Sequence, residues 1–444
     1  MRELVFPGNG FLDLASELLR ADEETAAVLF ANVVGRGEYG ERLLVRNAQQ
    51  APSDAYQQRS AVAIVLSPSY VAWVTKQALS RKQALVFVHT HPRCYNLPAF
   101  SPVDDRGEKA LAEFLRRRNP AVPHGALVLS EGGCRARMLG SDEPMRVVQV
   151  GKTLQFPFEP AVPPAAQFAF DRQVRAFGEQ GQVRLRSLRV GIVGLGGTGS
   201  IVAEQLAHLG IGNFLLIDPD VIEESNLNRL VGASLKDVGK AKAEVAARHV
   251  ESIHADVKTQ VVIGSVLQAS TARRLADVDF FFCCTDSHGS RAVLSQFAFQ
   301  YLVPCIDIGV SISSKDGRVT HITGRVQMLA PGLGCLTCAG LLDSDAIRRD
   351  LMTDYERQAD PYFIGAHEPQ PAVISLNGAV VSLAVTMFLA AVTHIPADAR
   401  YQLYNGITGT VRAVAHIPDP TCIVCSPVGA LARGNEWPLL ARQS

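Results

Sequence analysis

The sequence predicts an α/β protein of two domains, the second of which contains a doubly wound sheet. The first observation is an apolar, strand-like run at 189–193 that ends in a glycine-rich turn and continues as an apolar-periodic helix at 201–209. The second is the alternation of strand-like and helix-like segments along the chain. The third is a proline-rich stretch at 151–168 that interrupts this alternation. We therefore expect domains at 1–150 and 169–444, joined by a linker at 151–168.

Composition limits the class of partner. The chain of 444 residues is long enough for two or three domains of about 150 residues each. Lysine plus arginine and aspartate plus glutamate number 43 each, so the net charge is zero and neither a nucleic-acid nor a membrane partner is expected. The N-terminus lacks the apolar run of a signal peptide, so we expect a cytoplasmic protein whose cysteines are thiols or metal ligands. An apolar run at 379–392 is shorter than the ~18 residues of a membrane span and predicts a buried helix.

In the first domain, helix-like and strand-like segments follow one another in chain order. Segments with apolar residues three or four positions apart are interpreted as helices, and short apolar runs between turn residues as strands. The expected helices are 11–20, 70–81 and 104–118, and the expected strands are 26–34, 61–66, 84–88, 126–130 and 135–139. This content indicates a small α/β domain.

Two histidines follow the expected strand at 84–88. His89 and His91 are two positions apart, and side chains two apart on a strand point to the same side, so both can reach one metal ion. Asp104, at the start of an expected helix, offers a third ligand. Three protein ligands leave one coordination position for water, which is the arrangement of a catalytic zinc site. The alternative is that the histidines only pack at the end of a strand.

The order His-x-His-Pro, Ser-x-x-Asp and an upstream glutamate resembles the JAMM (JAB/MPN) metalloprotease family, zinc enzymes that cleave peptide or isopeptide bonds after ubiquitin-like modifiers. The resemblance covers the first domain and implies a JAB/MPN-like α/β fold. It implies that His89, His91 and Asp104 bind zinc. It also implies that Glu24 activates the zinc-bound water and that Ser101 donates a hydrogen bond to the oxyanion.

Two alternatives stay open for this domain. Asp22 and Glu23 lie beside Glu24, and Asp105 lies beside Asp104, so each is a competing candidate for the base or ligand role. The second alternative is an inactive relic of a metal site.

The glycine-rich turn of the second domain has the spacing of a nucleotide-binding loop. Gly194, Gly196 and Gly199 match the G-x-G-x-x-G pattern, in which missing side chains let backbone N–H groups at a helix start approach phosphate oxygens. Asp218 ends the next expected strand, 213–217, at the place in sequence where a carboxylate binds a ribose hydroxyl. This pattern alone indicates a dinucleotide or ATP.

The polar residues that follow favour ATP. Arg229 and Lys242 are cations that could hold a triphosphate, and Asp286 follows the expected strand 278–283, where a carboxylate could hold magnesium. Together they suit attack on an α-phosphate rather than docking of a nicotinamide. The candidate nucleotide-binding residues are Gly194, Gly196, Gly197, Gly199, Asp218, Asp220, Asn226, Asn228, Arg229, Lys242 and Asp286. Taken singly, the glycines could serve only packing, the asparagines could be turn residues and the lysine a surface residue.

These motifs together resemble the ThiF-like adenylating superfamily, which includes ubiquitin-activating and sulfur-carrier-activating enzymes. The resemblance runs from about Phe170 to the C-terminus and implies a Rossmann-like domain that uses ATP and magnesium as a homodimer. The segment Phe170-Asp-Arg172-Gln resembles a lead-in whose arginine reaches the nucleotide phosphates of the partner subunit. Arg172 inherits that catalytic role, with an ordinary surface arginine as the alternative.

Four cysteines form two C-x-x-C pairs. Cys335 with Cys338, and Cys422 with Cys425, present two thiolates each, and two such pairs complete a tetrahedral structural zinc site, with redox chemistry as the alternative. The 83 residues between the pairs contain no cysteine. Many ubiquitin-activating relatives form a thioester with a cysteine in that segment. We therefore expect the adenylate to pass to an outside nucleophile, such as a sulfur donor or a conjugating enzyme.

We expect a fusion of a JAMM-type zinc metallopeptidase with a ThiF-like adenylyltransferase, holding one catalytic and one structural zinc. The expected substrate is a ubiquitin-like or sulfur-carrier protein with a C-terminal Gly-Gly. One domain would trim this protein or remove it from a target, and the other would adenylate it. Two other classes stay open: an NAD-binding Rossmann oxidoreductase, which would use the same glycines and Asp218, and an inactive module that binds a modifier.

Overall fold

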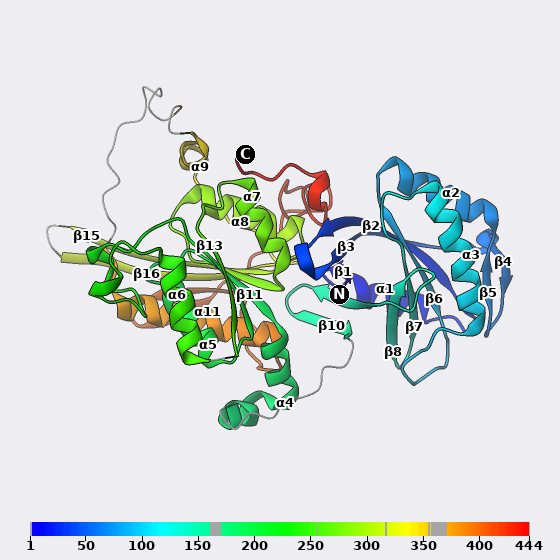
Figure 1. The fold of residues 1–444 in the computed structure, drawn as a ribbon, viewed down its shortest axis with the longest axis horizontal. Coiled ribbons are helices and arrows are strands. Elements are labelled where there is room, and N and C mark those ends of the chain that lie inside the picture. The colour runs from blue at the N-terminus through cyan, green and yellow to red at the C-terminus, as the bar shows by residue number, and fades with distance from the viewer. Residues whose placement is uncertain are drawn as a thin grey trace. The chain divides into compact units, whose positions relative to one another are not determined.

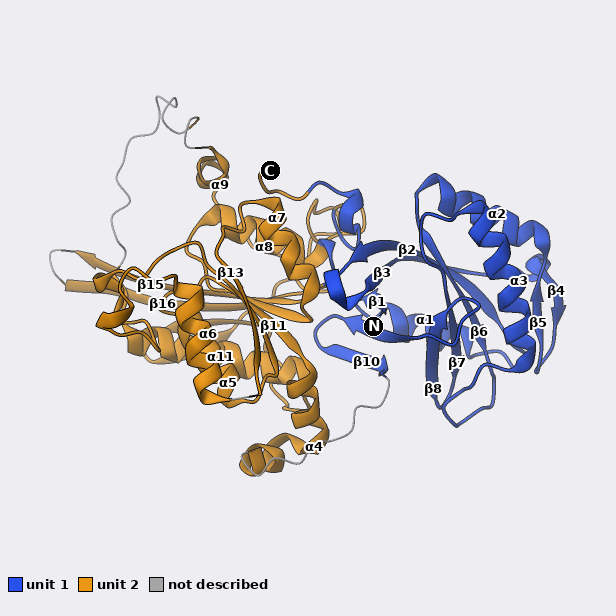
Figure 2. Ribbon diagram, in the orientation of Figure 1, with its two compact units in different colours: residues 1–161, 300–302, 430–438 blue, residues 162–299, 303–429, 439–444 orange. Residues whose placement is uncertain are grey.

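The fold is that of a computed structural model, which divides into two compact units (Figures 1 and 2). It describes residues 2–159, 170–254, 256–315, 318–353, 356 and 371–443. Unit 1 comprises Met1–Ala161, Gln300–Leu302 and Ala430–Pro438, and unit 2 comprises Val162–Phe299, Val303–Gly429 and Leu439–Ser444.

Unit 1 is built on an eight-stranded sheet that closes on itself. The strand order is β1-β3-β2-β6-β7-β8-β9-β10, and β1 also pairs in parallel with β9. β1 therefore has a partner on both sides, and the strands from β1 to β9 form a closed barrel. The elements of unit 1 are β1 (Glu3–Pro7), α1 (Gly10–Leu18), β2 (Ala26–Gly35), β3 (Glu41–Gln50), β4 (Tyr56–Arg59), β5 (Ile64–Leu66), α2 (Pro68–Ser80), β6 (Ala84–Thr90), α3 (Pro102–Arg118), β7 (Gly125–Ser130), β8 (Gly133–Met138), β9 (Pro144–Val150) and β10 (Leu154–Phe158).

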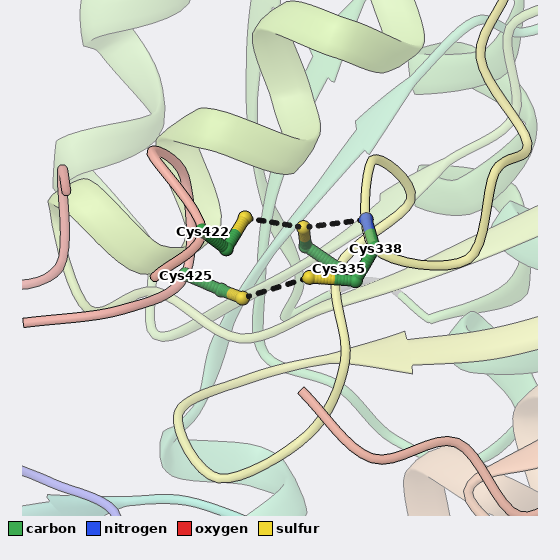
Figure 3. Close-up of side chains that lie close together, drawn as sticks. All are labelled: Cys335, Cys338, Cys422 and Cys425. Atoms are coloured by element: carbon green, nitrogen blue, oxygen red, sulfur yellow. Dashed lines mark hydrogen bonds between the residues drawn. The ribbon is translucent and has the colours of Figure 1, made fainter. Parts of the chain in front are cut away.

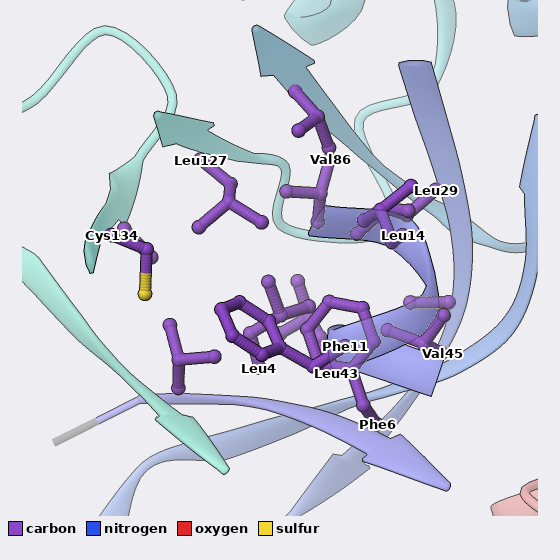
Figure 4. Close-up of a cluster of buried hydrophobic side chains, with 14 of the residues drawn as sticks. Leu4, Phe6, Phe11, Leu14, Leu29, Leu43, Val45, Val86, Leu127 and Cys134 are labelled. Atoms are coloured by element: carbon purple, nitrogen blue, oxygen red, sulfur yellow. The ribbon is translucent and has the colours of Figure 1, made fainter. Parts of the chain in front are cut away.

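Both faces of this sheet are buried. Along β6, Val86 and Val88 contribute to the core inside the closed sheet, which residues of α1 complete (Figure 4). Leu85 and Phe87 of the same strand contribute to a second core, which α2 and α3 cover. Because successive side chains of a strand point to opposite faces, a strand buried on both faces is apolar throughout. This continuous apolar run is what made β6 recognisable in the sequence.

Several strands of unit 1 escaped prediction because they carry buried charge. Glu3 of β1 is paired with Arg42 of β3 and Arg146 of β9, and all three side chains are less than a tenth exposed. Charged residues in these strands hide the apolar alternation that a strand assignment needs. The strand expected at 61–66 begins only at Ile64.

The linker predicted at 151–168 is wrong over its first half. Residues 154–158 form β10, which pairs antiparallel with β9. Pro157 is accepted there because β10 ends the strand order and pairs on one side only. Three other residues of this predicted linker, Pro160, Pro163 and Pro164, lie outside the described residues.

Two short segments that the sequence placed in the second domain belong to unit 1 instead. They are Gln300–Leu302 and Ala430–Pro438. Asn32 of β2 donates a hydrogen bond from Nδ2 to the backbone oxygen of Arg433 at 3.1 Å, so side chain to backbone contacts hold the later segment. Such contacts leave no periodic signal in the sequence.

Unit 2 contains a second eight-stranded sheet of order β13-β12-β11-β14-β15-β16-β17-β18. The strands from β13 to β15 are parallel, and those from β15 to β18 are antiparallel. The parallel half has the Rossmann-like strand order. Successive strands extend the sheet to one side from β11 to β13 and to the other side from β14 onward. The elements are α4 (Asp171–Ser187), β11 (Arg189–Val193), α5 (Gly199–His208), β12 (Asn213–Ile217), α6 (Lys242–Ile253), β13 (Lys258–Val262), α7 (Ala269–Arg273), β14 (Phe280–Cys283), α8 (His288–Gln300), β15 (Cys305–Lys315), β16 (Arg318–Leu329), α9 (Ser344–Leu351), α11 (Ile374–Val392), β17 (Tyr401–Asn405) and β18 (Thr410–Ala413).

Helices cover both faces of this sheet. Phe281 of β14 meets Phe297 of α8 edge to face, with ring centroids 6.1 Å apart. Its neighbours Phe280 and Phe282 point to the other face, where each contacts Phe388 of α11. Alternate residues of one strand therefore pack against helices on opposite sides, and the doubly wound α/β sheet is confirmed.

The apolar run predicted at 379–392 is part of a longer helix, α11, of 19 residues. By length and composition α11 is the one described helix that could cross a membrane, with half of its most apolar window buried. It packs against β15, β16 and α5 as a core helix of unit 2. Its polar first turn was not recognised as helical because Asn377, buried to 4% exposure, faces Gly197 rather than solvent.

Candidate functional site

The glycine-rich loop of unit 2 joins β11 to α5. Gly194 has φ +85°, and a Cβ there would lie 2.8 Å from the backbone oxygen of Cys284. A Cβ at Gly199 would overlap the backbone oxygen of Gly194. Packing alone therefore requires these two glycines. Gly196 differs, because a Cβ there would meet no atom within 4 Å, so this side of the loop is open to a phosphate group.

The start of α5 carries no capping side chain. Its N-cap residue, Thr198, makes no side-chain hydrogen bond to the helix backbone. The positive end of the helix dipole therefore has no side-chain cap and suits an anion, although the Ser200 N–H already donates to the Gly196 backbone oxygen at 3.0 Å. The loop also lies where the strand order reverses between β11 and β14, which is where open α/β sheets bind ligands.

Asp218 shapes this loop from the end of β12. The Leu195 N–H donates to Asp218 Oδ2 at 2.6 Å, and the Asp220 N–H donates to Oδ1 at 2.8 Å. Burial raises the pKa of the Asp218 carboxyl, and the two N–H donors partly offset this rise. Asp218 is 3% exposed and supports the loop, and its role as a ribose ligand stays a prediction.

The two cations of the site already have partners on this chain. Lys242 Nζ lies 2.8 Å from Asp220 Oδ2, and the Asp220 side chain is 62% exposed. Arg229 Nη1 donates to the backbone oxygen of Ser225 at 2.8 Å and to Asn228 Oδ1 at 3.0 Å. The methylene groups of Arg229 lie against the Gly197 position, so its side chain borders the loop.

Asn226 is structural in this arrangement. Its Oδ1 accepts a hydrogen bond from the Glu223 N–H at 3.3 Å, and it is 9% exposed. This matches the turn-residue alternative for Asn226, and its nucleotide-binding role stays a prediction.

Asp286 lies just beyond β14, at the same edge of the sheet as the glycine-rich loop. It is exposed and, within the described part of the chain, makes no side-chain hydrogen bond or ion pair. The preceding residue, Thr285, has its backbone oxygen held by two N–H groups of Arg291. An unpaired carboxylate on a fixed turn, beside a loop that suits phosphate, fits a magnesium ion.

Arg172 lies in the first turn of α4 and is exposed. The helix is kinked at Phe177 and Gly178, so the segment predicted as one helical lead-in has two parts. Arg172 has no ion pair with another described residue, whereas Arg175 on the same helix is paired with Asp171 at 2.8 Å. Its guanidinium is thus available to a ligand.

The four cysteines of the two C-x-x-C pairs meet in unit 2 (Figure 3). The Sγ atoms of Cys335 and Cys422 are 3.6 Å apart, and those of Cys338 and Cys425 are 3.4 Å apart. A tetrahedral site with Zn–S bonds of about 2.3 Å needs sulfur atoms roughly 3.8 Å apart, so the cluster fits zinc closely. A hydrogen bond from the Cys425 thiol lowers the pKa of Cys335, whereas burial raises the pKa of Cys338 and the hydrogen bond to Cys335 raises that of Cys425.

The structure also brings His89, His91 and Asp104 together in unit 1. Their ligand atoms all lie within 4.8 Å of one another. His89 Nε2 lies 3.4 Å from Asp104 Oδ1, and His91 Nε2 lies 3.9 Å from Asp104 Oδ2. His89 Nε2 is buried and has no hydrogen-bond partner in the described chain. A buried imidazole nitrogen that faces a carboxylate without bonding to it fits a metal between them.

A capping box fixes Asp104. The Ser101 N–H donates to Asp104 Oδ2 at 2.6 Å, and the Asp104 N–H donates to Ser101 Oγ at 3.2 Å. Burial raises the pKa of Asp104, but the nearby His89 imidazole and the Ser101 N–H outweigh it and hold the pKa far below its usual range. Asp104 is therefore anionic, and its carboxylate faces the two histidines.

Glu24 lies two residues before the start of β2, with Oε1 4.0 Å from His91 Nε2. Burial raises the pKa of Glu24 to about 7, with Asp104 acting in the same direction and His89 opposing it. The competing carboxylates do not lie beside the histidines. Glu23 is exposed and pairs with Arg59, and Asp22 is exposed and pairs with Arg93. Asp105 pairs with Arg137 at 2.7 Å. Among these carboxylates, Glu24 is the one beside the histidines.

The sequence pattern missed three polar residues of the unit 2 site. Asn377 of α11 faces Gly197, and Arg291 and Asp307 lie behind the Asp286 turn. Arg291 and Asp307 belong to a helix and a strand that look purely structural in sequence. The only available signal was an aspartate within the otherwise apolar start of β15.

Comparison with known proteins identifies the family of the second part of the chain. The model of the ThiF family matches residues 170–424, more than half of the chain. A molybdopterin-synthase adenylyltransferase of Escherichia coli is 29% identical over 258 residues, which cover 58% of this chain and 95% of that protein. A SAMP-activating enzyme E1 of Haloferax volcanii is 27% identical over 254 residues, which cover 57% of this chain and 85% of that protein.

A third relative matches over a shorter stretch. The ubiquitin-like modifier-activating enzyme 5 of Oryza sativa subsp. japonica is 31% identical over 170 residues, 35% of this chain, and the match spans 38% of that protein's length. The family match leaves residues 1–169 outside, so the resemblance of the first domain to metalloproteases stays a prediction. From Phe170 onward the fold, the loop and the family match agree, and the chain belongs to the ThiF family.

Proposed function

We propose that unit 2 uses magnesium and ATP to adenylate the C-terminal glycine of a ubiquitin-like or sulfur-carrier protein. The observation that carries this proposal is the meeting of three features at one edge of the sheet: the open side of Gly196, the uncapped start of α5 and the unpaired carboxylate of Asp286. The relatives are named as modifier-activating or SAMP-activating enzymes and as a molybdopterin-synthase adenylyltransferase. These names support a ubiquitin-like or sulfur-carrier protein as the substrate.

In this reaction a carboxylate oxygen of the substrate attacks the α-phosphorus of ATP. The bond from that phosphorus to the bridging oxygen breaks, pyrophosphate leaves, and an acyl-adenylate remains. N–H groups at the start of α5 hold the phosphates, and Arg229 and Lys242 offset their charge. Asp220, exposed and close to Lys242, is better placed than Asp218 to accept from a ribose hydroxyl. Magnesium held by Asp286 would neutralise charge on the leaving pyrophosphate.

The acyl-adenylate would then pass to a nucleophile outside this chain. The residues between Cys338 and Cys422 contain no cysteine that could take it as a thioester. A sulfur donor or the cysteine of a conjugating enzyme provides the nucleophile that this reaction class requires.

We further propose that unit 2 works as a homodimer in which Arg172 reaches the nucleotide of the partner. Replacing Arg172 with alanine should lower ATP–pyrophosphate exchange by about 10²-fold, because one cation that stabilises the transition-state charge is lost. Mixing Arg172→Ala subunits with Asp286→Ala subunits should restore part of the activity, since a mixed dimer contains one complete site. Arg175→Ala, on the same helix, is the matched control and should leave exchange unchanged. No recovery in mixed dimers would contradict the role across the dimer.

A second proposal concerns unit 1, which we infer to be a zinc-dependent peptidase or isopeptidase acting on the same class of modifier. It is favoured by His89 Nε2, buried without a partner opposite Asp104, and by Glu24 beside His91. Zinc held by His89, His91 and Asp104 would polarise a water molecule and the scissile carbonyl. Glu24 would take the proton of that water, and the Ser101 hydroxyl would donate to the oxyanion.

Metal analysis of the purified chain should find two zinc ions, one labile to chelator at the histidines and one held by the four thiolates. Cys422→Ser should lose the second ion and lower the unfolding temperature of unit 2 by more than about 5 °C, because a structural zinc contributes folding free energy. Cys94→Ser, outside both clusters, is the control and should keep both ions. One zinc or none in the parent would reject one site or both.

A further inference from the structure

We propose that Asp307 is a positioning residue for the turn that carries Asp286, acting through Arg291. This inference rests on the proposed magnesium and ATP site of unit 2. It assigns a role to a buried ion cluster that none of the sequence motifs includes.

The first link joins the turn to Arg291. The backbone oxygen of Thr285, one residue before Asp286, accepts from Arg291 Nε at 3.1 Å and from Nη2 at 2.9 Å. The same Nη2 donates to the backbone oxygen of Ile308 at 3.3 Å. One guanidinium therefore ties the turn after β14 to the neighbouring strand β15. A fork of two donors fixes the carbonyl direction, which a single ammonium group cannot do.

The second link joins Arg291 to Asp307. Asp307 pairs in register with Cys283, the last residue of β14, so its carboxylate is level with the start of the turn. It is fully buried, 3.6 Å from Arg291 Nε and 2.7 Å from Arg325 Nη2. Neither Asp307 oxygen has a well-aligned hydrogen bond within the described chain, so the two arginines are what compensates its burial.

The four charged groups of this region balance one another. Asp286 and Asp307 carry one negative charge each, and Arg291 and Arg325 carry one positive charge each. Burial alone would lower the pKa of Arg291, yet Asp307 and, more weakly, Asp286 keep it raised, so these groups interact. Without the Asp307 charge, the cluster beside the proposed magnesium site becomes cationic and repels a divalent ion.

Asp307 therefore acts in two ways that a purely structural residue would not. It holds the guanidinium that fixes the Asp286 turn, and it cancels a positive charge next to the proposed metal position. Both effects predict that loss of the Asp307 charge lowers the affinity for a divalent cation even in a variant that still folds.

The test is the affinity of the full-length protein for Mn²⁺, measured by electron paramagnetic resonance with a non-hydrolysable ATP analogue. Asp307→Asn keeps the shape and removes the charge, and should weaken Mn²⁺ binding by about 10-fold. Arg325→Met makes the cluster anionic, and Mn²⁺ should bind at least as tightly as in the parent. Should Asp307→Asn fail to fold, Arg291→Lys tests the same contact, because lysine cannot hold the Thr285 oxygen with two donors. This variant should also weaken Mn²⁺ binding.

Asp237→Asn is the matched control. Asp237 is another buried carboxylate between two cations, 2.8 Å from Arg248 and 3.0 Å from Lys240, and its loss should change unfolding temperature but not Mn²⁺ affinity. A folded Asp307→Asn that binds Mn²⁺ as the parent does would overturn the proposal, as would an equal loss in Asp237→Asn. Absence of pyrophosphate exchange in the parent would reject the proposed function, whereas the Mn²⁺ titration reports on the Asp307 link by itself.

Discussion

Asp286→Ala is expected to lower ATP–pyrophosphate exchange by about 10³-fold or more. Asp286 is the exposed, unpaired carboxylate at the edge of the sheet where the loop and the start of α5 meet. The substitution removes the carboxylate that we propose to hold magnesium, which would offset the charge that develops on pyrophosphate. The measurement is the rate at which labelled pyrophosphate enters ATP in the presence of a carrier protein.

The control for this substitution is Asp345→Ala, which removes an exposed carboxylate of α9 in the same unit and should leave exchange unchanged. Asp286→Ala should also keep the unfolding temperature of the parent, since the side chain makes no hydrogen bond or close ion pair within the described chain. Exchange by Asp286→Ala at the parent rate would show that another group holds the metal.

Glu24→Gln is expected to slow cleavage after Gly-Gly by about 10²- to 10⁴-fold while zinc content stays unchanged. Glutamine keeps the shape of the side chain but cannot take a proton from the zinc-bound water. His91→Ala should lose both the labile zinc and the cleavage. Neither substitution should affect pyrophosphate exchange in unit 2. The assay is hydrolysis of a carrier protein with a C-terminal extension, followed by mass spectrometry.

Glu23→Gln is the matched control, because Glu23 is adjacent and exposed and pairs with Arg59 instead of facing the histidines. It should cleave as the parent does. Should Glu24→Gln cleave as fast as the parent, the base is misassigned and Asp22 or Glu23 becomes the candidate. A parent that cleaves no such substrate would identify unit 1 as a relic of the metal site.

The sequence predicted best where local pattern and function coincide. The Rossmann-like half of unit 2 was readable because its strands are short apolar runs followed by polar residues at their carboxyl ends. His89 and Asp104 are 15 positions apart, yet the turn and the capping box that bring them together follow from local residues. The two cysteine pairs needed only their ligand chemistry to indicate that they meet.

The sequence predicted least where long-range contacts decide. The parallel pairing of β1 with β9 joins residues near 5 and 148, and its strands conceal a buried ion cluster around Glu3. The sequence predicts Asp218 as a ribose ligand but gives no sign of its two backbone hydrogen bonds, which support the loop. Asp307 belongs to no sequence motif. Its proposed positioning role depends on contacts with two arginines, one from a helix and one from another strand.

The central claim is that this member of the ThiF family adenylates a carrier protein, and ATP–pyrophosphate exchange tests it most directly. The full chain should catalyse exchange that depends on magnesium and on a carrier with a C-terminal Gly-Gly, and a carrier lacking its final glycine should give none. The protein should bind ATP and not NADH. Binding of NADH without any exchange would contradict the account and favour an oxidoreductase, and binding of a carrier without exchange would favour an inactive modifier-binding module.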